Sequence, residues 1–490
     1  MVRVIVTIGL IQVLGILIGL VRAKVVAVLG GPEGVGIIST LGQVVQTAAH
    51  FSALSLPFAA IKFLSRSHSQ SHTAFKNCYA SFLRILLVLS FTGTAVIIGL
   101  LVFRPNILGA EMFRYKGLLS IAILSLPAMV LSGFLINVLA AAQKSRQSAM
   151  VTVVTAAAVT IASCLGIWLD GIRGFYIGNA LANFLVIAGL IIYLRQSLGL
   201  PLYERGISII EEFRRSPDII PFAVLQYFST LMYSCSFLVA RYTVLVSHGE
   251  TTAGLLQSVL AIPLSIGAVL NPANGLFLTP IMNRDIDPRE KVKAALEFQK
   301  KLMLIQAAMS LPIVLFPGLI LTILYSAKFA VAAQFIFLFI VWQALTQLAG
   351  VHQALMIGLD DVKAYTVITG VSYFVALLFC WLAVPKYGIN GVAAGFCIGS
   401  ALIYLLSWAR LKKIHGYSLP TQSIVLVSYS LALMALIGLI TIRLEQFTAL
   451  NFACRLGIFA CFILSLLFFF SKKEKNALYD MIGQFNPWKA

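Results

Sequence analysis

Long apolar runs, separated by short polar stretches, extend from the first residues of the chain to about residue 471. Runs of about 20 residues with few charges are typical of helices that cross a bilayer. The pattern predicts about fourteen such helices, near residues 3–29, 34–64, 77–103, 117–142, 147–169, 174–195, 217–247, 251–281, 299–325, 329–358, 362–384, 391–411, 420–442 and 450–471. The polar interruptions between them are too short to form a soluble domain. The sequence therefore predicts an all-α polytopic membrane protein.

Composition and charge support this interpretation. The 490 residues are 60% hydrophobic and only 11% charged, whereas soluble domains contain about 25% charged residues. The formal net charge of +19 is explained by topology. With the N-terminus in the cytoplasm, about 24 Lys and Arg fall on the cytoplasmic side and roughly 9 on the other, in agreement with the positive-inside rule. We therefore expect both termini in the cytoplasm, a retained first helix and no nucleic-acid partner.

The chain repeats itself weakly at an offset of 217 residues. Residues 171–178 (Gly-Ile-Arg-Gly-Phe-Tyr-Ile-Gly) align with residues 388–395 (Gly-Ile-Asn-Gly-Val-Ala-Ala-Gly), each at the turn into a new helix. The same shift places Lys24 on Arg241. Two repeats of six helices enter the membrane from the same side, so we expect a pseudo-twofold axis along the membrane normal and a substrate site between the lobes.

The repeat predicts four segments. They are a six-helix lobe at 1–198, a cytoplasmic interfacial linker at 199–216, a second six-helix lobe at 217–414, and two extra helices with a cytoplasmic tail at 415–490. The linker mixes apolar and charged residues, which suits either a short helix on the membrane surface or a plain tethering loop.

Acidic side chains are missing from the interiors of the predicted helices, whereas basic side chains occur there. None of the 17 Asp and Glu lies deep in a helix, whereas Lys24 and Arg241 are embedded late in two of them. Ionisable groups inside a membrane are costly and usually face a partner or a wet cavity. Because Arg offers a planar fork and Lys a movable point charge, the pair is suited to clamp a diphosphate. The alternative is that both side chains extend to the outer interface.

Other basic side chains are secondary candidates for anion binding. Arg22 lies two positions from Lys24, hence about 200° away around a regular helix. We expect Lys24 to face the cavity and Arg22 to face a neighbouring helix or the interface. Arg84 lies in the third helix, where it could guide an anionic head group or reach the cytoplasmic interface. Arg455 lies in the last helix, where we expect it to extend to the interface.

Two histidines, His50 and His352, lie in the second and tenth helices and are candidates for coupling to a proton gradient, since histidine titrates near neutral pH. The alternative is an ordinary hydrogen-bonded helix histidine. We expect no cofactor and no metal site: the seven cysteines form no C-x-x-C pair and suit small buried hydrophobes, and no Walker sequence or catalytic constellation occurs. We therefore expect no enzymatic activity.

Three segments resemble a known family: residues 23–36 (Ala-Lys-Val-Val-Ala-Val-Leu-Gly-Gly-Pro-Glu-Gly-Val-Gly), 240–242 (Ala-Arg-Tyr) and 386–394 (Lys-Tyr-Gly-Ile-Asn-Gly-Val-Ala-Ala). They are similar to Wzx-type polysaccharide flippases of the multidrug/oligosaccharidyl-lipid/polysaccharide exporter superfamily. The resemblance covers about residues 1–414. Lys24 matches the family's basic position in the first helix, and Arg241 matches a basic residue of some members. Many members stop near twelve helices, whereas this chain is predicted to have fourteen, as do lipid II flippases.

The resemblance implies translocation of an undecaprenyl-diphosphate-linked oligosaccharide, such as an O-antigen unit, across the bacterial inner membrane by alternating access. It also implies a V-shaped pair of lobes around a cationic cavity. Expected partners are the polyprenyl-diphosphate-linked glycan and membrane lipids, and polysaccharide polymerase and chain-length proteins are further candidates. We expect the transporter to be a monomer. The alternatives are a lipid II-type flippase, a cation-coupled multidrug exporter, which usually needs a buried carboxylate, and a membrane enzyme, which usually needs a large outer loop.

Overall fold

The computed structural model describes residues 2–103, 113–200, 219–274, 278–282, 286–417 and 449–466, together with a few isolated positions. Within these ranges the chain is almost entirely helical and contains no strand. Nearly all of the predicted linker at 199–216 and of the predicted helix at 420–442 lies outside the described residues. The all-α polytopic fold class predicted from the sequence is confirmed.

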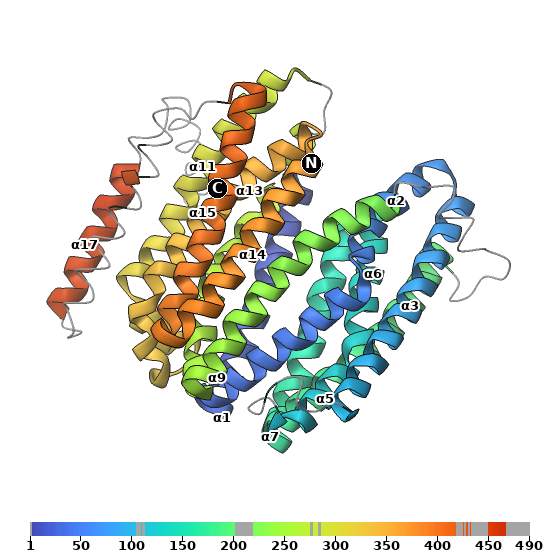
Figure 1. The fold of residues 1–490 in the computed structure, drawn as a ribbon, viewed down its shortest axis with the longest axis horizontal. Coiled ribbons are helices and arrows are strands. Elements are labelled where there is room, and N and C mark those ends of the chain that lie inside the picture. The colour runs from blue at the N-terminus through green and yellow to red at the C-terminus, as the bar shows by residue number, and fades with distance from the viewer. Residues whose placement is uncertain are drawn as a thin grey trace, which may run out of the picture.

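The described elements are shown in Figure 1. In chain order they are α1 (Val2–Ala53), α2 (Leu56–Gln70), α3 (His72–Phe103), α5 (Lys116–Leu124), α6 (Leu126–Ala141), α7 (Ser145–Leu198), α9 (Ile219–Ala273), α10 (Thr279–Met282), α11 (Pro288–Leu315), α12 (Pro317–Leu324), the 3-10 helix η3 (Ala327–Phe335), α13 (Ile336–Gly358), α14 (Val362–Tyr387), α15 (Ile389–His415) and α17 (Ala449–Leu466).

Three of these helices are each two crossings joined at a glycine. Helices α1, α7 and α9 contain 52, 54 and 55 residues, or about 80 Å each at about 1.5 Å per residue, more than twice the bilayer core. Each is interrupted by a glycine with positive φ: Gly31 (63°), Gly171 (56°) and Gly249 (81°). Glycine adopts this conformation without the steric cost that other residues incur. Eight described helices are long and apolar enough to span, or nine with the bent pair α11–α12, and the three double helices raise the described crossings to twelve.

The turns that the repeat aligns have matching backbone angles. Gly31 (φ 63°, ψ −171°) and Gly249 (φ 81°, ψ 175°) reverse the chain in equivalent places. Gly171 (φ 56°, ψ −143°) and Gly388 (φ 53°, ψ −131°) form a second matching pair. We call the end of the molecule that carries these four turns the glycine end.

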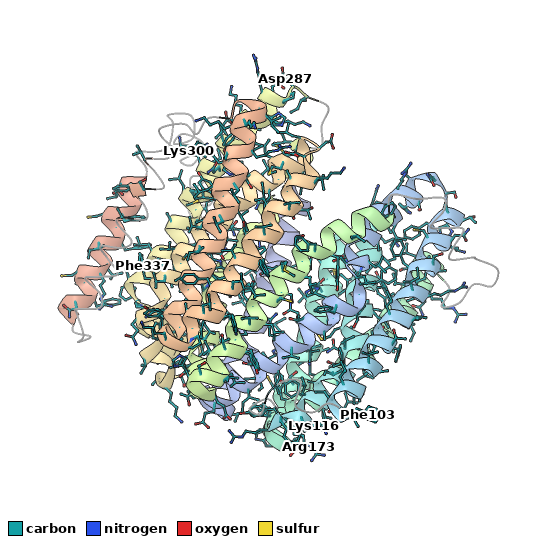
Figure 2. The ribbon with its side chains drawn as sticks, viewed as in Figure 1. Phe103, Lys116, Arg173, Asp287, Lys300 and Phe337 are labelled. Carbon is teal, nitrogen blue, oxygen red and sulfur yellow. The ribbon has the colours of Figure 1, made fainter. Side chains whose placement is uncertain are left out.

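The helices form two groups with α1 and α9 between them (Figure 1). One group contains α2, α3, α5, α6 and α7, and the other contains α11, α13, α14 and α15. The groups converge at the glycine end and diverge toward the end that carries the N-terminus, which we call the open end. Figure 2 shows charged side chains at both ends: Lys116 and Arg173 at the glycine end and Asp287 at the open end.

Backbone contact between α1 and α9 closes the glycine end. A Cβ atom added to Gly36 would lie 2.1 Å from the carbonyl oxygen of Glu250, and one added to Gly254 would lie 1.8 Å from that of Pro32. Such approach is possible only where side chains are absent. Nearby, the Tyr115 hydroxyl donates to the carboxylate of Glu250. The two groups of helices are therefore held together at this end.

Arg455 attaches α17 to the rest of the protein. Its Nη1 donates to the carbonyl oxygen of Leu315 at 2.7 Å, and its guanidinium lies 5.8 Å from the centre of the Phe316 ring. These residues mark an 87° bend between α11 and α12, where carbonyls at the end of α11 lack helical partners. The expectation that Arg455 extends to the interface is therefore wrong: only 8% of its surface is exposed.

Candidate functional site

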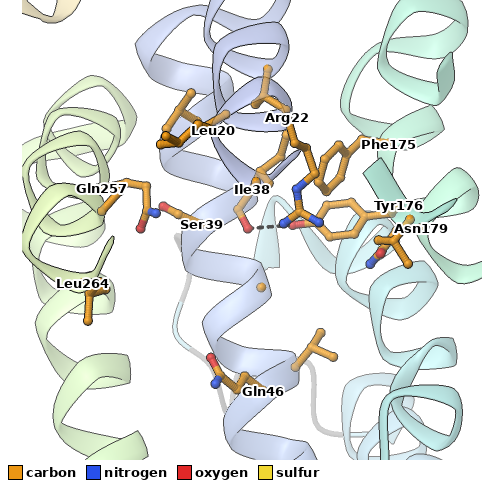
Figure 3. A pocket seen from close by; sticks show the side chains of 18 of the residues that line it. Leu20, Arg22, Ile38, Ser39, Gln46, Phe175, Tyr176, Asn179, Gln257 and Leu264 are labelled. Atoms are coloured by element: carbon orange, nitrogen blue, oxygen red, sulfur yellow. Dashed lines mark hydrogen bonds between the residues drawn. The ribbon is translucent and has the colours of Figure 1, made fainter. Parts of the chain in front are cut away.

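A cavity of about 630 Å³ lies between α1, α7 and both halves of α9, with further walls from α5, α6 and the residue that follows α12 (Figure 3). This volume is within the range of small-molecule sites, about 300–1,000 Å³. Most of its lining is apolar, and the small residues Gly19 and Gly42 widen it, because a Cβ on either would meet no atom within 4 Å.

The only charged residues that line the cavity in the described part of the chain are two arginines, Arg22 and Arg241. Among the described residues, no Asp or Glu lines it. Buried cations are costly unless a partner compensates them. A cavity with two positive charges and no carboxylate is therefore suited to an anionic ligand.

Neutral oxygen atoms hold the Arg241 guanidinium in place. Its Nη1 donates to Gln43 Oε1 at 2.8 Å, and its Nη2 donates to Gln257 Oε1 at 2.8 Å. The carbonyl oxygen of Ser39 also accepts from Nη1, at 3.3 Å. The Nε atom is buried and makes no hydrogen bond within the described residues. These contacts fix the orientation of the side chain while leaving its charge uncompensated.

Arg22 lies on the α7 side of the cavity (Figure 3). Its guanidinium lies 5.6 Å from the centre of the Phe175 ring, a cation–π contact. The neighbouring Tyr176 hydroxyl donates to the carbonyl oxygen of Ile38 at 3.1 Å, which joins α7 to α1 at this level. Within the described residues the Arg22 guanidinium makes no hydrogen bond, so its donors are available to a ligand.

Lys24 does not line the cavity. Its Nζ donates to the carbonyl oxygen of Thr322 at 3.0 Å, in the last turn of α12. A cation at this position stabilises the carbonyl end of a helix. The expectation that Lys24 faces inward and Arg22 faces away is therefore wrong. The repeat matches Lys24 with Arg241 in height along the helix, but height does not determine direction around the helix axis.

The other sequence candidates also lie away from the cavity. Arg84 on α3 and His50 in the last turn of α1 are partly buried and are not among its lining residues. His352 is fully buried in α13. Its Nε2 lies 3.0 Å from the Tyr417 hydroxyl, and its ring stacks on Tyr404 with centroids 4.6 Å apart. The structure thus favours a packing role for His352 and leaves coupling by either histidine as a proposal.

Amide side chains in the cavity were missed by reasoning from charge alone. The cavity is lined by four of them: Gln46, Asn179, Asn183 and Gln257. All lie within apolar helices, where an amide is itself unusual. Their occurrence within apolar runs is the signal that the sequence carries, but a neutral side chain is not revealed by the pattern of charge.

The fold and cavity define a multi-pass membrane protein with a cationic interior. No protein-family model matches the chain, and no curated protein matches it. Solved structures, however, share its fold. The lipid II flippase MurJ in an inward closed conformation has a TM-score of 0.67 and 15% identity, covering 96% of this chain and 100% of its own.

Multidrug transporters of the MOP superfamily are also similar. An inward-facing multidrug resistance MATE transporter has a TM-score of 0.64 and 14% identity, covering 82% of this chain and 96% of its own. A Pyrococcus furiosus transporter described as having a binding pocket of reverse polarity has a TM-score of 0.55 and 14% identity, covering 83% and 95%. The chain therefore has the fold of MOP superfamily transporters, which include both flippases and drug exporters.

Proposed function

We propose that this protein is a flippase that moves an undecaprenyl-diphosphate-linked oligosaccharide across the bacterial inner membrane. The observation that carries the proposal is the cavity whose charged lining, among the described residues, consists of Arg22 and Arg241. Away from water, guanidinium–phosphate hydrogen bonds are strong and directional. The Wzx-like segments noted in the sequence support a glycan as the cargo.

The two arginines have different roles in this mechanism. Arg241 is held by Gln43 and Gln257 and forms a fixed positive centre. Arg22 has no competing hydrogen bond in the described structure, so it can turn from the Phe175 ring toward an arriving phosphate. Together they replace part of the water shell that a diphosphate loses on leaving the membrane surface.

Translocation then requires the glycine end to open and the open end to close. We assign the glycine end to the outer face and the open end to the cytoplasm, in agreement with the positive-inside distribution of charge. Contacts at the glycine end, including Gly36 with Glu250 and Lys24 with Thr322, would separate as the two helix groups rock about the occupied site. The polyprenyl tail would remain in the bilayer throughout.

A lipid II-type flippase is the second candidate, favoured by the match to MurJ over 96% of this chain. A multidrug exporter is supported by the MATE matches. An exporter of cationic drugs, however, would place its substrate beside two arginines with no carboxylate among the described cavity residues.

The test measures binding to the full chain in lipid nanodiscs. The probes are an undecaprenyl-diphosphate-linked oligosaccharide, uncharged undecaprenol, lipid II and the cationic dye ethidium. We expect saturable binding of the oligosaccharide probe, and its loss in the double variant R22A/R241A. The matched control R173A removes an arginine at the glycine end, 3.9 Å from Asp170 and outside the cavity.

Full binding by the double variant, or a preference for ethidium, would overturn the proposal. A preference for lipid II would favour the second candidate. Transport itself is measured in proteoliposomes with a fluorescent form of the preferred lipid probe. The same proposal assigns the protein to the inner membrane with cytoplasmic termini, working as a monomer beside polysaccharide polymerase and chain-length proteins.

A further inference from the structure

Three amide side chains line the cavity at the level of the arginines and beyond it toward the open end. Gln46 is on α1, and Asn179 and Asn183 are on α7; Figure 3 shows Gln46 and Asn179 along the cavity. The hydrogen bond between Tyr176 and Ile38 aligns α7 with α1 at the level of Arg22. From their glycine turns at Gly31 and Gly171 both helices run toward the open end, so positions counted from this bond can be compared.

The count places the amides at two levels. Asn179 is three residues beyond Tyr176, or about 5 Å at about 1.5 Å per residue. Gln46 is eight residues beyond Ile38 and Asn183 seven beyond Tyr176, so both lie about 11 Å from the bond. Arg241 donates to the carbonyl oxygen of Ser39 and to Gln43, one and five residues beyond Ile38. Asn179 therefore lies at the level of the arginines, whereas Gln46 and Asn183 lie beyond them toward the open end.

Hydrogen-bonding groups of these amides remain available. Asn183 Nδ2 donates to the carbonyl oxygen and to Oδ1 of Asn179, at 2.7 and 3.1 Å. This pairing orients the two side chains and leaves the Nδ2 donors of Asn179 unused within the described residues. Gln46 is exposed, and its amide makes no hydrogen bond to another described residue. An amide presents a donor and an acceptor side by side, the pattern that neighbouring sugar hydroxyls or an acetamido group complement.

Space is available beside these groups. Gly42 lies four residues before Gln46, on the same face of α1. A Cβ at Gly42 would meet no atom within 4 Å. A sugar ring can therefore approach the α1 backbone between Ile38 and Gln46.

We propose that Gln46, Asn179 and Asn183 form a glycan subsite that binds the uncharged sugar residues next to the diphosphate. This inference rests on the proposed function and adds a direction to it. The diphosphate lies at the arginines, and the glycan extends from it toward the open end. Gln46 and Asn183 are specificity-determining residues, because they lie beyond the arginines and contact the sugar and not the phosphate, and Asn179 orients Asn183.

The experiment compares two probes on the full chain in nanodiscs: undecaprenyl diphosphate without sugar, and undecaprenyl diphosphate carrying a neutral disaccharide. For Q46A/N183A we expect roughly tenfold weaker binding of the glycosylated probe, from the loss of two neutral hydrogen bonds. Binding of the sugar-free probe should be unchanged. The control Q334A removes an exposed amide of η3 that does not line the cavity.

A second pair of variants tests whether the sugar occupies the space beside Gly42, independently of the hydrogen bonds. G42L should weaken the glycosylated probe and spare the sugar-free one, whereas G189L, at a glycine outside the cavity where a Cβ meets no atom within 4 Å, should bind both as the wild type does. Equal weakening of both probes by Q46A/N183A, or no weakening of either, would overturn the subsite. If R22A/R241A also leaves the sugar-free probe bound, the proposed function fails as well. If the wild type binds neither probe, both proposals fail.

Discussion

Arg22 and Lys24 lie two residues apart on α1 and contact opposite halves of the protein. Arg22 lies against Phe175 on α7 and lines the cavity. Lys24 reaches Thr322 on α12 and lies outside it. One turn of helix therefore connects a ligand-facing cation to a contact that holds the glycine end closed.

The first prediction separates the two basic residues by ligand binding. Arg22→Ala should weaken binding of undecaprenyl diphosphate by about tenfold or more, because a hydrogen bond to a charged group contributes about 1.5–3 kcal/mol. Lys24→Ala should change it by less than about threefold, since the Lys24 side chain points away from the cavity. Both affinities are measured by titration in nanodiscs. A larger loss from Lys24→Ala would contradict the assignment.

The second prediction concerns Lys24 and stability. Lys24→Met should destabilise the protein by about 1 kcal/mol, because the carbonyl end of α12 loses its cation. Lys24→Arg, which retains a donor and a charge, should recover most of the loss. Thermal unfolding in detergent measures both variants. An unchanged melting temperature in Lys24→Met would show that the contact with Thr322 adds nothing.

The third prediction tests the backbone contact at the glycine end. Gly36→Ala should destabilise this end by about 1–3 kcal/mol, because the new methyl group would overlap the carbonyl of Glu250. Labelling of a cysteine introduced at Ser39 should then become faster from the glycine end. Gly189→Ala is the matched control, since a Cβ there meets no atom within 4 Å. Equal behaviour of the two variants would exclude a tight contact.

The fourth prediction concerns the attachment of α17. Arg455→Ala removes the hydrogen bond to Leu315 and the contact with Phe316. We expect lower thermal stability and faster proteolysis near α17, with unchanged affinity for undecaprenyl diphosphate. The carbonyl of Leu315 would lose its partner at a cost of about 1–3 kcal/mol. Loss of ligand binding in this variant would instead link α17 to the cavity.

The positions of the membrane-spanning helices along the chain were predictable, because every such helix must be long and apolar. The helix turns were also predictable, since Gly171 and Gly388 appear in matching segments and have matching backbone angles. These features depend on local sequence. They do not require knowledge of which helices are neighbours.

The direction of each side chain could not be obtained in the same way. Arg22 and Lys24 are equally basic and nearly at the same depth, and only the packing of α7 and α12 against α1 distinguishes them. The bend after Leu315 likewise gives Arg455 a partner that its own helix does not reveal. The amides of the cavity are neutral, so the pattern of charge along the sequence does not reveal Gln46 and Asn179.

The attachment of α17 through Arg455 has a consequence for movement. Its anchor lies on the α11–α12 elbow, within one of the two helix groups. Because α17 is attached to one half only, it moves with that half when the half tilts and does not restrain the other half. The described helix α17 thus moves with one half of the protein, and the relative movement of the two halves takes place where α1 and α9 meet.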